Sequence, residues 1–172
     1  MNRYRPPQAK SSPYITEDGF KMLQAELKTL WEKRGAVTKA LTAAAAEGDR
    51  SENAEYIYRK KELREIDRRI RYLQTRLPDL NIVPAQQQEM KQIFFGAWVN
   101  VKIFSADRAT NHIATYRIVG PDEFDLDKKY ISLDSPLAKA LLKKTINDEV
   151  TIQTDKSELR YFVIDVNYTL PE

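Results

Sequence analysis

The most informative part of the chain is residues 56–80, YIYRKKELREIDRRIRYLQTRLPDL. Its apolar side chains recur at alternating spacings of three and four, at Tyr56, Leu63, Ile66, Ile70, Leu73, Leu77 and Leu80, with Arg59 at one position of the series. Residues 20–44 repeat this pattern, with Arg34 at one position. Because such a repeat aligns side chains along one side of a helix, the two series predict two helices that pack along a shared seam.

The segment between the two series, Glu47-Gly48-Asp49-Arg50-Ser51, has the composition of a turn. Gly48 is expected at the position that ends the first helix, where glycine adopts a left-handed conformation without strain. Thr16 is expected to cap the start of that helix, followed by acidic residues in its first turn. Two helices of similar length joined by a short turn predict an antiparallel hairpin.

The rest of the chain divides at changes in composition. Residues 1–13 are rich in proline, serine and positive charge, which is typical of a disordered extension. Residues 14–84 form the predicted coiled coil, with an acidic tip at 48–55. After a linker, residues 85–172 contain β-branched and aromatic strands and one short helix, 135–144, with Asp134 or Ser135 as its N-cap. The expected fold class is α+β: a helical hairpin followed by a small antiparallel sheet wrapped on one helix.

Composition excludes several kinds of site. The 172 residues include no cysteine and one histidine, His112, so thiol nucleophiles, cysteine-ligated metals and sites with two imidazoles are excluded. His112 is expected at the surface or in a turn. No apolar run reaches 18 residues, and the N-terminus lacks the apolar region of a signal peptide, so we expect a cytoplasmic protein with no membrane partner.

The net charge of +3 is an average over segments of opposite sign. The acidic tip contains Asp49, Glu52 and Glu55. In one interpretation, Asp49 caps the second helix and Glu52 completes a capping box. In the other, the two carboxylates share a cation. Because Mg²⁺ prefers six oxygen ligands, another molecule would then have to supply the rest.

Directly after the tip, residues 59–76 carry eight basic and three acidic side chains. These bases could be solvated or paired with Glu62, Glu65 and Asp67, as is usual on a coiled coil. Alternatively, their excess could hold a phosphate backbone. Nearby tyrosines could stack on nucleobases, although tyrosine in or beside a helical seam is more often packed in the core.

Four stretches of the sequence together resemble the bacterial Gre transcript-cleavage factors, and their GreB branch more than GreA. They are GDRSENAEY at 48–56, RKKELREIDRRIRYL at 59–73, FGAWV at 95–99 and DSPLAKAL at 134–141. The resemblance extends from about Tyr14 to the C-terminus. Two features depart from it: Glu47 is more acidic than expected before Gly48, and the proline-rich extension has no counterpart.

The resemblance implies a coiled coil joined to an FKBP-like domain. It also implies that the factor is not an enzyme itself. Its C-terminal domain would dock at the rim of the RNA polymerase secondary channel, and its helical finger would reach the active centre to stimulate cleavage of backtracked nascent RNA. The expected partners are the polymerase and the RNA 3′ end, with the free protein a monomer.

The resemblance also assigns roles to individual residues. Asp49 and Glu52 would hold a Mg²⁺ ion jointly with the polymerase, and Asn53 would orient the tip or the attacking water. The expected docking residues are Asp134, Ser135 and Pro136. The expected RNA-binding residues are Arg59, Lys60, Lys61, Arg64, Arg68 and Arg69. Two other functions stay open: a channel-binding regulator that does not stimulate cleavage, and a prolyl isomerase, for which likeness of fold is a poor argument.

Overall fold

The computed structural model describes residues 10–46, 53–85, 91–105, 108–154 and 157–169. The chain forms two compact units. One comprises residues 18–80, and the other comprises residues 81–172 together with the N-terminal segment through Glu17. Among the described residues, no helix is both long enough and apolar enough to cross a membrane.

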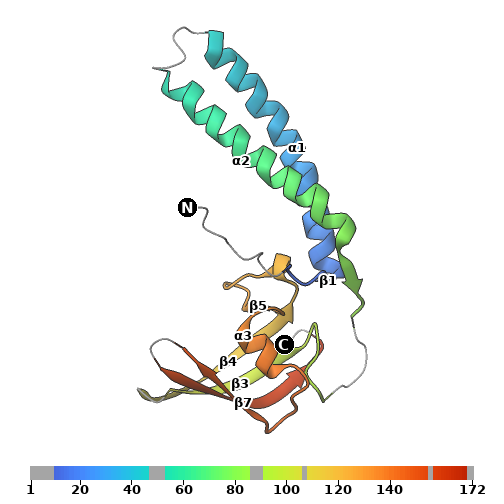
Figure 1. Cartoon of the computed structure of the whole chain (residues 1–172), viewed down its shortest axis with the longest axis vertical. Helices are drawn as coiled ribbons and strands as arrows, with labels where there is room; N and C mark the ends of the chain where they lie inside the picture. The colour runs from blue at the N-terminus through green and yellow to red at the C-terminus, as the bar shows by residue number, and fades with distance from the viewer. Residues whose placement is uncertain (1–9, 47–52, 86–90, 106–107, 155–156, 170–172) are drawn as a thin grey trace, which may run out of the picture. The chain divides into compact units, whose positions relative to one another are not determined.

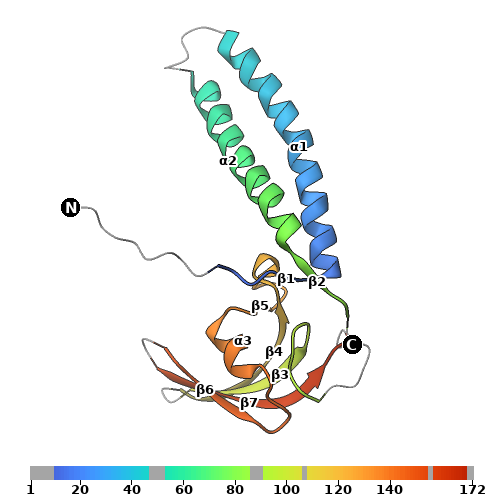
Figure 2. The ribbon, with the colours of Figure 1, turned by 45° about the vertical axis from the view of Figure 1, so that its right-hand side comes forward.

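The helical unit confirms the predicted hairpin. Helix α1 (Glu17–Ala46) and helix α2 (Ala54–Arg76) run side by side in both ribbon views (Figures 1 and 2). Their shared seam buries Val37, Ile66 and Ile70, against which Leu27, Leu30 and Leu63 pack. These six residues all belong to the two predicted series.

Helix α2 is shorter than the second series predicts. It ends at Arg76 and continues as the 3₁₀-helix η1 (Leu77–Asp79), which contains Pro78. Proline has no main-chain N–H and its ring clashes with the preceding turn, so an α-helix cannot continue through this position undisturbed.

The start of α2 also differs from the predicted capping box. The helix begins at Ala54, and its N-cap is Asn53, whose side chain accepts a hydrogen bond from the Tyr56 main-chain N–H. The interpretation of Asp49 as N-cap of this helix is therefore wrong, because asparagine caps a helix as well as aspartate and Asn53 lies nearer the apolar series. Asp49, Glu52 and Gly48 themselves lie outside the described residues.

The sheet unit is built around five strands in the order β5-β4-β3-β7-β6. Strands β3, β4, β6 and β7 pair antiparallel, as predicted, whereas β5 pairs parallel with β4, which the sequence pattern did not indicate. The strand bounds are β3 (Trp98–Ser105), β4 (Arg108–Val119), β5 (Tyr130–Ser132), β6 (Glu149–Gln153) and β7 (Glu158–Asn167).

One helix, α3 (Pro136–Leu141), lies against the concave face of the curled sheet (Figure 2). Ala138 and Leu141 of this helix are fully buried, and they join a core that includes Val99, Val101 and Val163 from the two central strands. The α+β fold class is thereby confirmed. The helix is shorter than predicted, and Lys143, two residues beyond its last residue, has a left-handed φ of 66°.

The boundary between units differs from the one expected at residues 84 and 85. Strand β1 (Tyr14–Thr16) pairs in parallel with strand β2 (Asn81–Val83), and both strands belong to the sheet unit. The predicted disorder of residues 1–13 also does not hold for Ser12, which is hydrogen-bonded to Asp134. The chain thus leaves and re-enters the sheet unit at adjacent strands, with the whole hairpin inserted between them.

Candidate functional site

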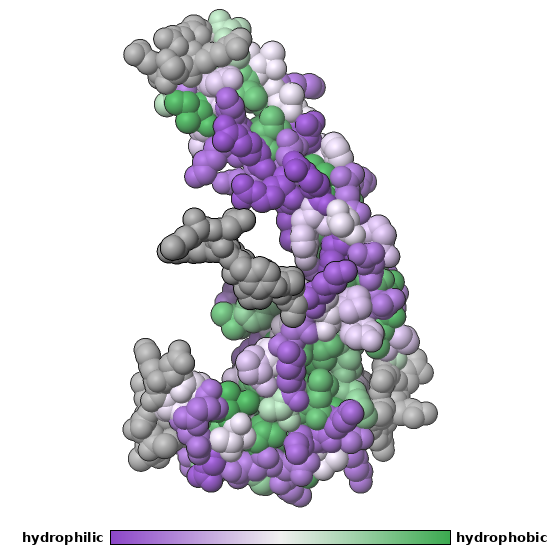
Figure 3. Space-filling model, viewed as in Figure 1, coloured by the Kyte–Doolittle hydropathy of each residue, from purple (hydrophilic) through white to green (hydrophobic). Residues whose placement is uncertain are grey.

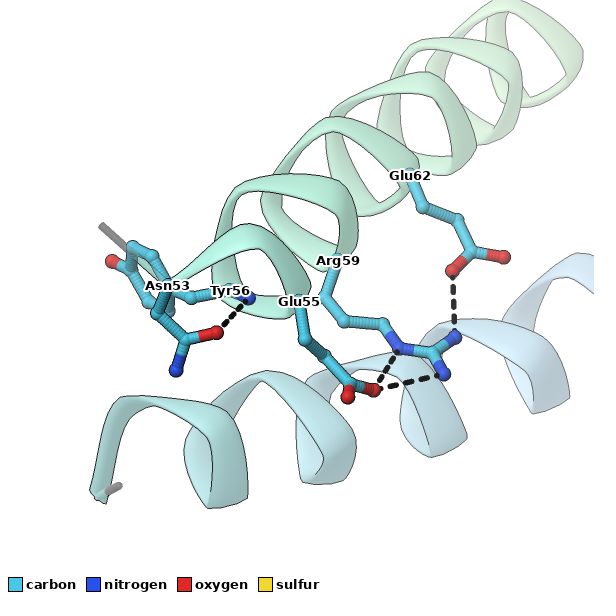
Figure 4. Close-up of polar contacts among 5 residues, drawn as sticks. All are labelled: Asn53, Glu55, Tyr56, Arg59 and Glu62. Atoms are coloured by element: carbon cyan, nitrogen blue, oxygen red, sulfur yellow. Dashed lines mark hydrogen bonds and ion pairs between the residues drawn. The ribbon is translucent and has the colours of Figure 1, made fainter. Parts of the chain in front are cut away.

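The side chain of Asn53 links the two helices of the hairpin through hydrogen bonds. Its amide oxygen accepts the Tyr56 N–H at 3.1 Å, and its amide nitrogen donates to the main-chain oxygen of Ala44 at 2.9 Å. Figure 4 shows the contact with Tyr56 at the start of α2. Through these two bonds Asn53 caps α2 and links its start to α1. The two roles expected for Asn53, orienting the tip or the attacking water, stay predictions.

Next along α2, Arg59 lies between two carboxylates (Figure 4). It donates to Glu55 at 3.3 and 3.4 Å and to Glu62 at 3.2 Å, while Lys33 of α1 contacts the other oxygen of Glu62 at 3.0 Å. Hydrogen bonds to Glu62 and Glu55 raise the pKa of Arg59 above its ordinary value. Hydrogen bonds from Lys33 first, and then Arg59, lower the pKa of Glu62. Arg59, expected to bind RNA, is therefore engaged within the hairpin.

Arg69 is engaged in the same way. Its guanidinium donates twice to the Glu26 carboxylate of α1, at 2.7 and 2.8 Å, and lies 5.2 Å from the centre of the Tyr72 ring. This two-bond geometry favours a defined pairing between helices. A second pair, Arg34 to Asp67 at 2.6 Å, connects the helices in the opposite sense. Two of the six expected RNA-binding residues therefore serve the hairpin itself.

The remaining bases of the expected set are exposed. Lys60 lies 5.7 Å from the centre of the Tyr56 ring, and Lys61, Arg64 and Arg68 reach into solvent. Arg71, which belongs to the same basic run but was not among the expected RNA-binding residues, is also exposed. Among the residues that the structure describes, no carboxylate lies within ion-pair distance of Lys61, Arg64, Arg68 or Arg71.

Lys61, Arg64, Arg68 and Arg71 share one face of α2, and we call them the basic stripe. At 100° per residue they fall within about 80° of the helix circumference, and they span roughly 15 Å along its axis. The stripe lies opposite the seam residues Ile66, Ile70 and Leu73, which are buried. Hydrophilic residues likewise dominate the surface of the hairpin in the space-filling view (Figure 3). The spacing of three, four and three residues is the signal that would have included Arg71.

The expected docking residues form a fixed turn at the start of α3. Ser135 is the N-cap, as predicted, because its hydroxyl accepts the Ala138 N–H at 3.2 Å, and Pro136 occupies the first turn. The Asp134 N–H donates to the Ser132 hydroxyl at 3.1 Å. The Asp134 carboxylate accepts the Ser12 N–H at 2.9 Å and also the Ser12 hydroxyl.

Metal-ligating side chains are scattered in the part of the chain that the structure describes. Across the described ranges, no three histidine, cysteine, aspartate or glutamate side chains gather closely enough to hold a metal ion. His112 lies exposed on β4, which agrees with the expected surface position.

Family models match both units of the chain. The model described as "Transcription elongation factor, N-terminal" matches residues 13–82, and "Transcription elongation factor, GreA/GreB, C-term" matches residues 87–168. Since these matches cover most of the sequence, the chain belongs to the GreA/GreB family of transcription elongation factors. The predicted resemblance to Gre factors is confirmed.

The curated relatives point to the GreB branch. Transcription elongation factor GreB of Pseudomonas aeruginosa is 48% identical over 169 residues, covering 98% of each chain. GreB of Yersinia pestis is 51% identical over 161 residues, covering 93% of this chain and 91% of the relative.

Two solved structures were also matched. The transcription factor Gfh1 has 23% identity and a TM-score of 0.43, covering 92% of this chain and 99% of its own. The GreA/GreB factor from Nitrosomonas europaea has 16% identity and a TM-score of 0.38, covering 91% and 100%.

Proposed function

We propose that this transcription elongation factor stimulates the cleavage of backtracked nascent RNA by RNA polymerase, and that the polymerase holds the catalytic centre. The observation that carries the proposal is the basic stripe: four exposed bases follow one face of α2 away from the tip that contains Asp49 and Glu52. A tip with two carboxylates suits a metal, and a line of cations beside it suits a phosphate backbone.

In this proposal the basic stripe holds the RNA 3′ end that backtracking extrudes. Lys61, Arg64 and Arg68 would contact successive phosphates, together with Lys60 and Arg71. Arg59 and Arg69 would contribute indirectly, by holding the two helices together. Arg59 pairs with Glu62, which also binds Lys33 of α1, and Arg69 pairs with Glu26 of α1. In this proposal the exposed bases bind RNA, whereas Arg59 and Arg69 stabilise the helical hairpin.

At the tip, Asp49 and Glu52 would contribute ligands to a Mg²⁺ ion that the polymerase also binds. When bound, such an ion supplies charge stabilisation for in-line displacement at phosphorus. Asn53 would keep the tip at the end of the hairpin through its bonds to Ala44 and Tyr56.

Asp134, Ser135 and Pro136 would dock at the rim of the secondary channel, so that the hairpin enters the channel as a monomeric finger. The half-buried Asp134 and Ser135 and the exposed Pro136 form a turn that is fixed before any partner arrives. The site of action is then the cytoplasm, where bacterial polymerase works.

The test is a reconstituted backtracked elongation complex with labelled RNA, to which the factor and Mg²⁺ are added. Wild type should release short 3′ fragments. Asp49→Ala and Glu52→Ala should lose this stimulation while still binding polymerase. Asp79→Asn is the matched control, since Asp79 is an exposed acid of the same hairpin in η1.

Two other outcomes would contradict parts of the proposal. If wild type binds polymerase without changing RNA length, the chain is a channel-binding regulator. If both tip variants cleave at the wild-type rate, the assignment of the carboxylates is wrong.

A further inference from the structure

Residues 12–16, which we call the N-terminal strap, are held by two carboxylates of the sheet unit. Ser12 donates its N–H to Asp134 at 2.9 Å and also donates its hydroxyl. Thr16 donates its N–H to Glu123, in the 3₁₀-helix η2 (Pro121–Glu123), at 2.9 Å and also donates its hydroxyl. Each carboxylate thus binds the N–H and O–H of one strap residue, and the two strap residues are four positions apart.

Between these two contacts the strap is packed closely. Ile15 is fully buried, and the Tyr14 ring lies 6.4 Å from the ring of Phe95, centre to centre. A Cβ atom added to Gly120 would lie 2.0 Å from the main-chain oxygen of Tyr14. Only glycine leaves room for the strap at this point, so the strap is an integral part of the sheet unit.

The strap reaches the turn that the proposed function uses for docking. The main chain of that turn is fixed from within, because the Ser135 N–H donates to the Ser132 oxygen at 2.9 Å and the Asp134 N–H to the Ser132 hydroxyl. The carboxylate of Asp134, by contrast, is oriented by Ser12, which lies 122 positions earlier in the sequence. The Asp134 side chain remains partly exposed, so it is oriented by Ser12 and is still accessible to a partner.

We propose that Ser12 is a positioning residue for polymerase docking, acting through Asp134. The inference rests on the proposed function, in which Asp134 contacts the channel rim. A side chain that is already oriented loses less conformational freedom on binding, which strengthens association without a new contact. The partner surface that fits a half-exposed carboxylate is one with hydrogen-bond donors, such as basic side chains or main-chain N–H groups.

Thr16 supplies a matched control within the same strap. Thr16→Val removes one hydroxyl bond to a carboxylate, as Ser12→Ala does, but Glu123 is not part of the docking turn. Both variants keep the main-chain N–H bond, and both should fold. Ser12→Thr keeps the hydroxyl and should restore the wild-type behaviour.

The experiment measures the Kd of the full-length factor for RNA polymerase by fluorescence anisotropy. Ser12→Ala should weaken binding about three- to tenfold, and Thr16→Val should not. In a double-mutant cycle, Ser12→Ala should have no further effect when Asp134 is already alanine. The Tm of each variant is also measured, to check that Ser12→Ala and Thr16→Val lose similar stability.

Three results would overturn the inference. The first is an unchanged Kd in Ser12→Ala, and the second is tighter binding of polymerase by that variant. The third is that Ser12→Ala weakens binding equally whether residue 134 is aspartate or alanine. Tighter binding would show that the strap competes with polymerase for Asp134. If wild type does not bind polymerase at all, the proposed function itself fails, which is a distinct outcome.

Discussion

The side-chain amide of Asn53 donates to the main-chain oxygen of Ala44 at 2.9 Å, which fastens the start of α2 to the end of α1. Ala44 is itself buried in the hairpin, so the acceptor is held in place. Residues 47–52, which include Asp49 and Glu52, connect α1 to α2 in the sequence. The Asn53 side chain links the two helices on either side of this segment.

Asn53→Ala should lower the stability of the hairpin and reduce RNA cleavage. The variant loses the helix cap, which is worth about 1 kcal/mol, together with the bond to Ala44. Cleavage of backtracked RNA should fall, while the Kd for polymerase should stay within about twofold if docking rests on the sheet unit. Asn53→Asp separates the two effects, because it keeps the acceptor for Tyr56 and loses the donor to Ala44. Full cleavage activity in Asn53→Asp would show that the cap alone is sufficient.

The basic stripe should govern the salt dependence of RNA binding. Arg64→Ala combined with Arg68→Ala should weaken binding of a short single-stranded RNA and reduce the slope of log K against log salt by about 1.4, since each phosphate that is no longer neutralised accounts for about 0.7. Anisotropy titrations at several salt concentrations measure this slope. The control is the pair Lys28→Ala and Lys39→Ala, two exposed bases of α1. An equal change in slope for the control would indicate that only net charge matters.

Gly120→Ala should destabilise the sheet unit. The added methyl group would lie 2.0 Å from the Tyr14 oxygen, so the strap must move, and such overpacking typically costs about 1–3 kcal/mol. Hydrogen exchange at the main chain of Ile15 and Thr16 should speed up, and the Tm should fall. Gly35→Ala is the matched control: it lies in α1, where the added Cβ would meet open space, and it should stabilise the helix by up to about 1 kcal/mol.

The Lys33–Glu62–Arg59 network should make the stability of the hairpin sensitive to acid. The folded state lowers the pKa of Glu62 below its ordinary value of 4.5, so the stabilisation is present above pH 4.5 and is lost as the pH falls through the folded-state pKa. Urea unfolding at a series of pH values should show a smaller acid-dependent loss in Glu62→Gln than in wild type. Glu65→Gln, at an exposed glutamate of α2 that has no cationic partner among the described residues, should follow wild type.

The hairpin was predictable because its evidence is local. The three-four spacing of Leu63, Ile66 and Ile70 defines the seam without reference to any distant residue, and the Ser135-Pro136 pair marks the start of α3 for the same reason. The capping residue of α2 was harder, since aspartate, serine and asparagine all precede Ala54 and have similar preferences for the position.

The strap and the pairing of individual bases were not predictable from pattern. Ser12 lies in a segment of polar and proline-rich composition, and its partner Asp134 is 122 residues away. Composition counts Arg59 and Arg68 alike, although one is bonded to two glutamates and the other is exposed. Only the position of each base around the helix, relative to the seam and to the facing helix, separates the two roles.

The contacts of the strap with Gly120, Glu123 and Asp134 set an order of events while the chain is being made. The strap is synthesised more than 100 residues before Gly120, Glu123 and Asp134. At roughly 5–20 residues per second, the strap waits on the order of 5–25 s for these partners. The hairpin, whose contacts are closer in sequence, can form in the meantime. The strap thus leaves the ribosome well before the partners that hold it in the fold are available.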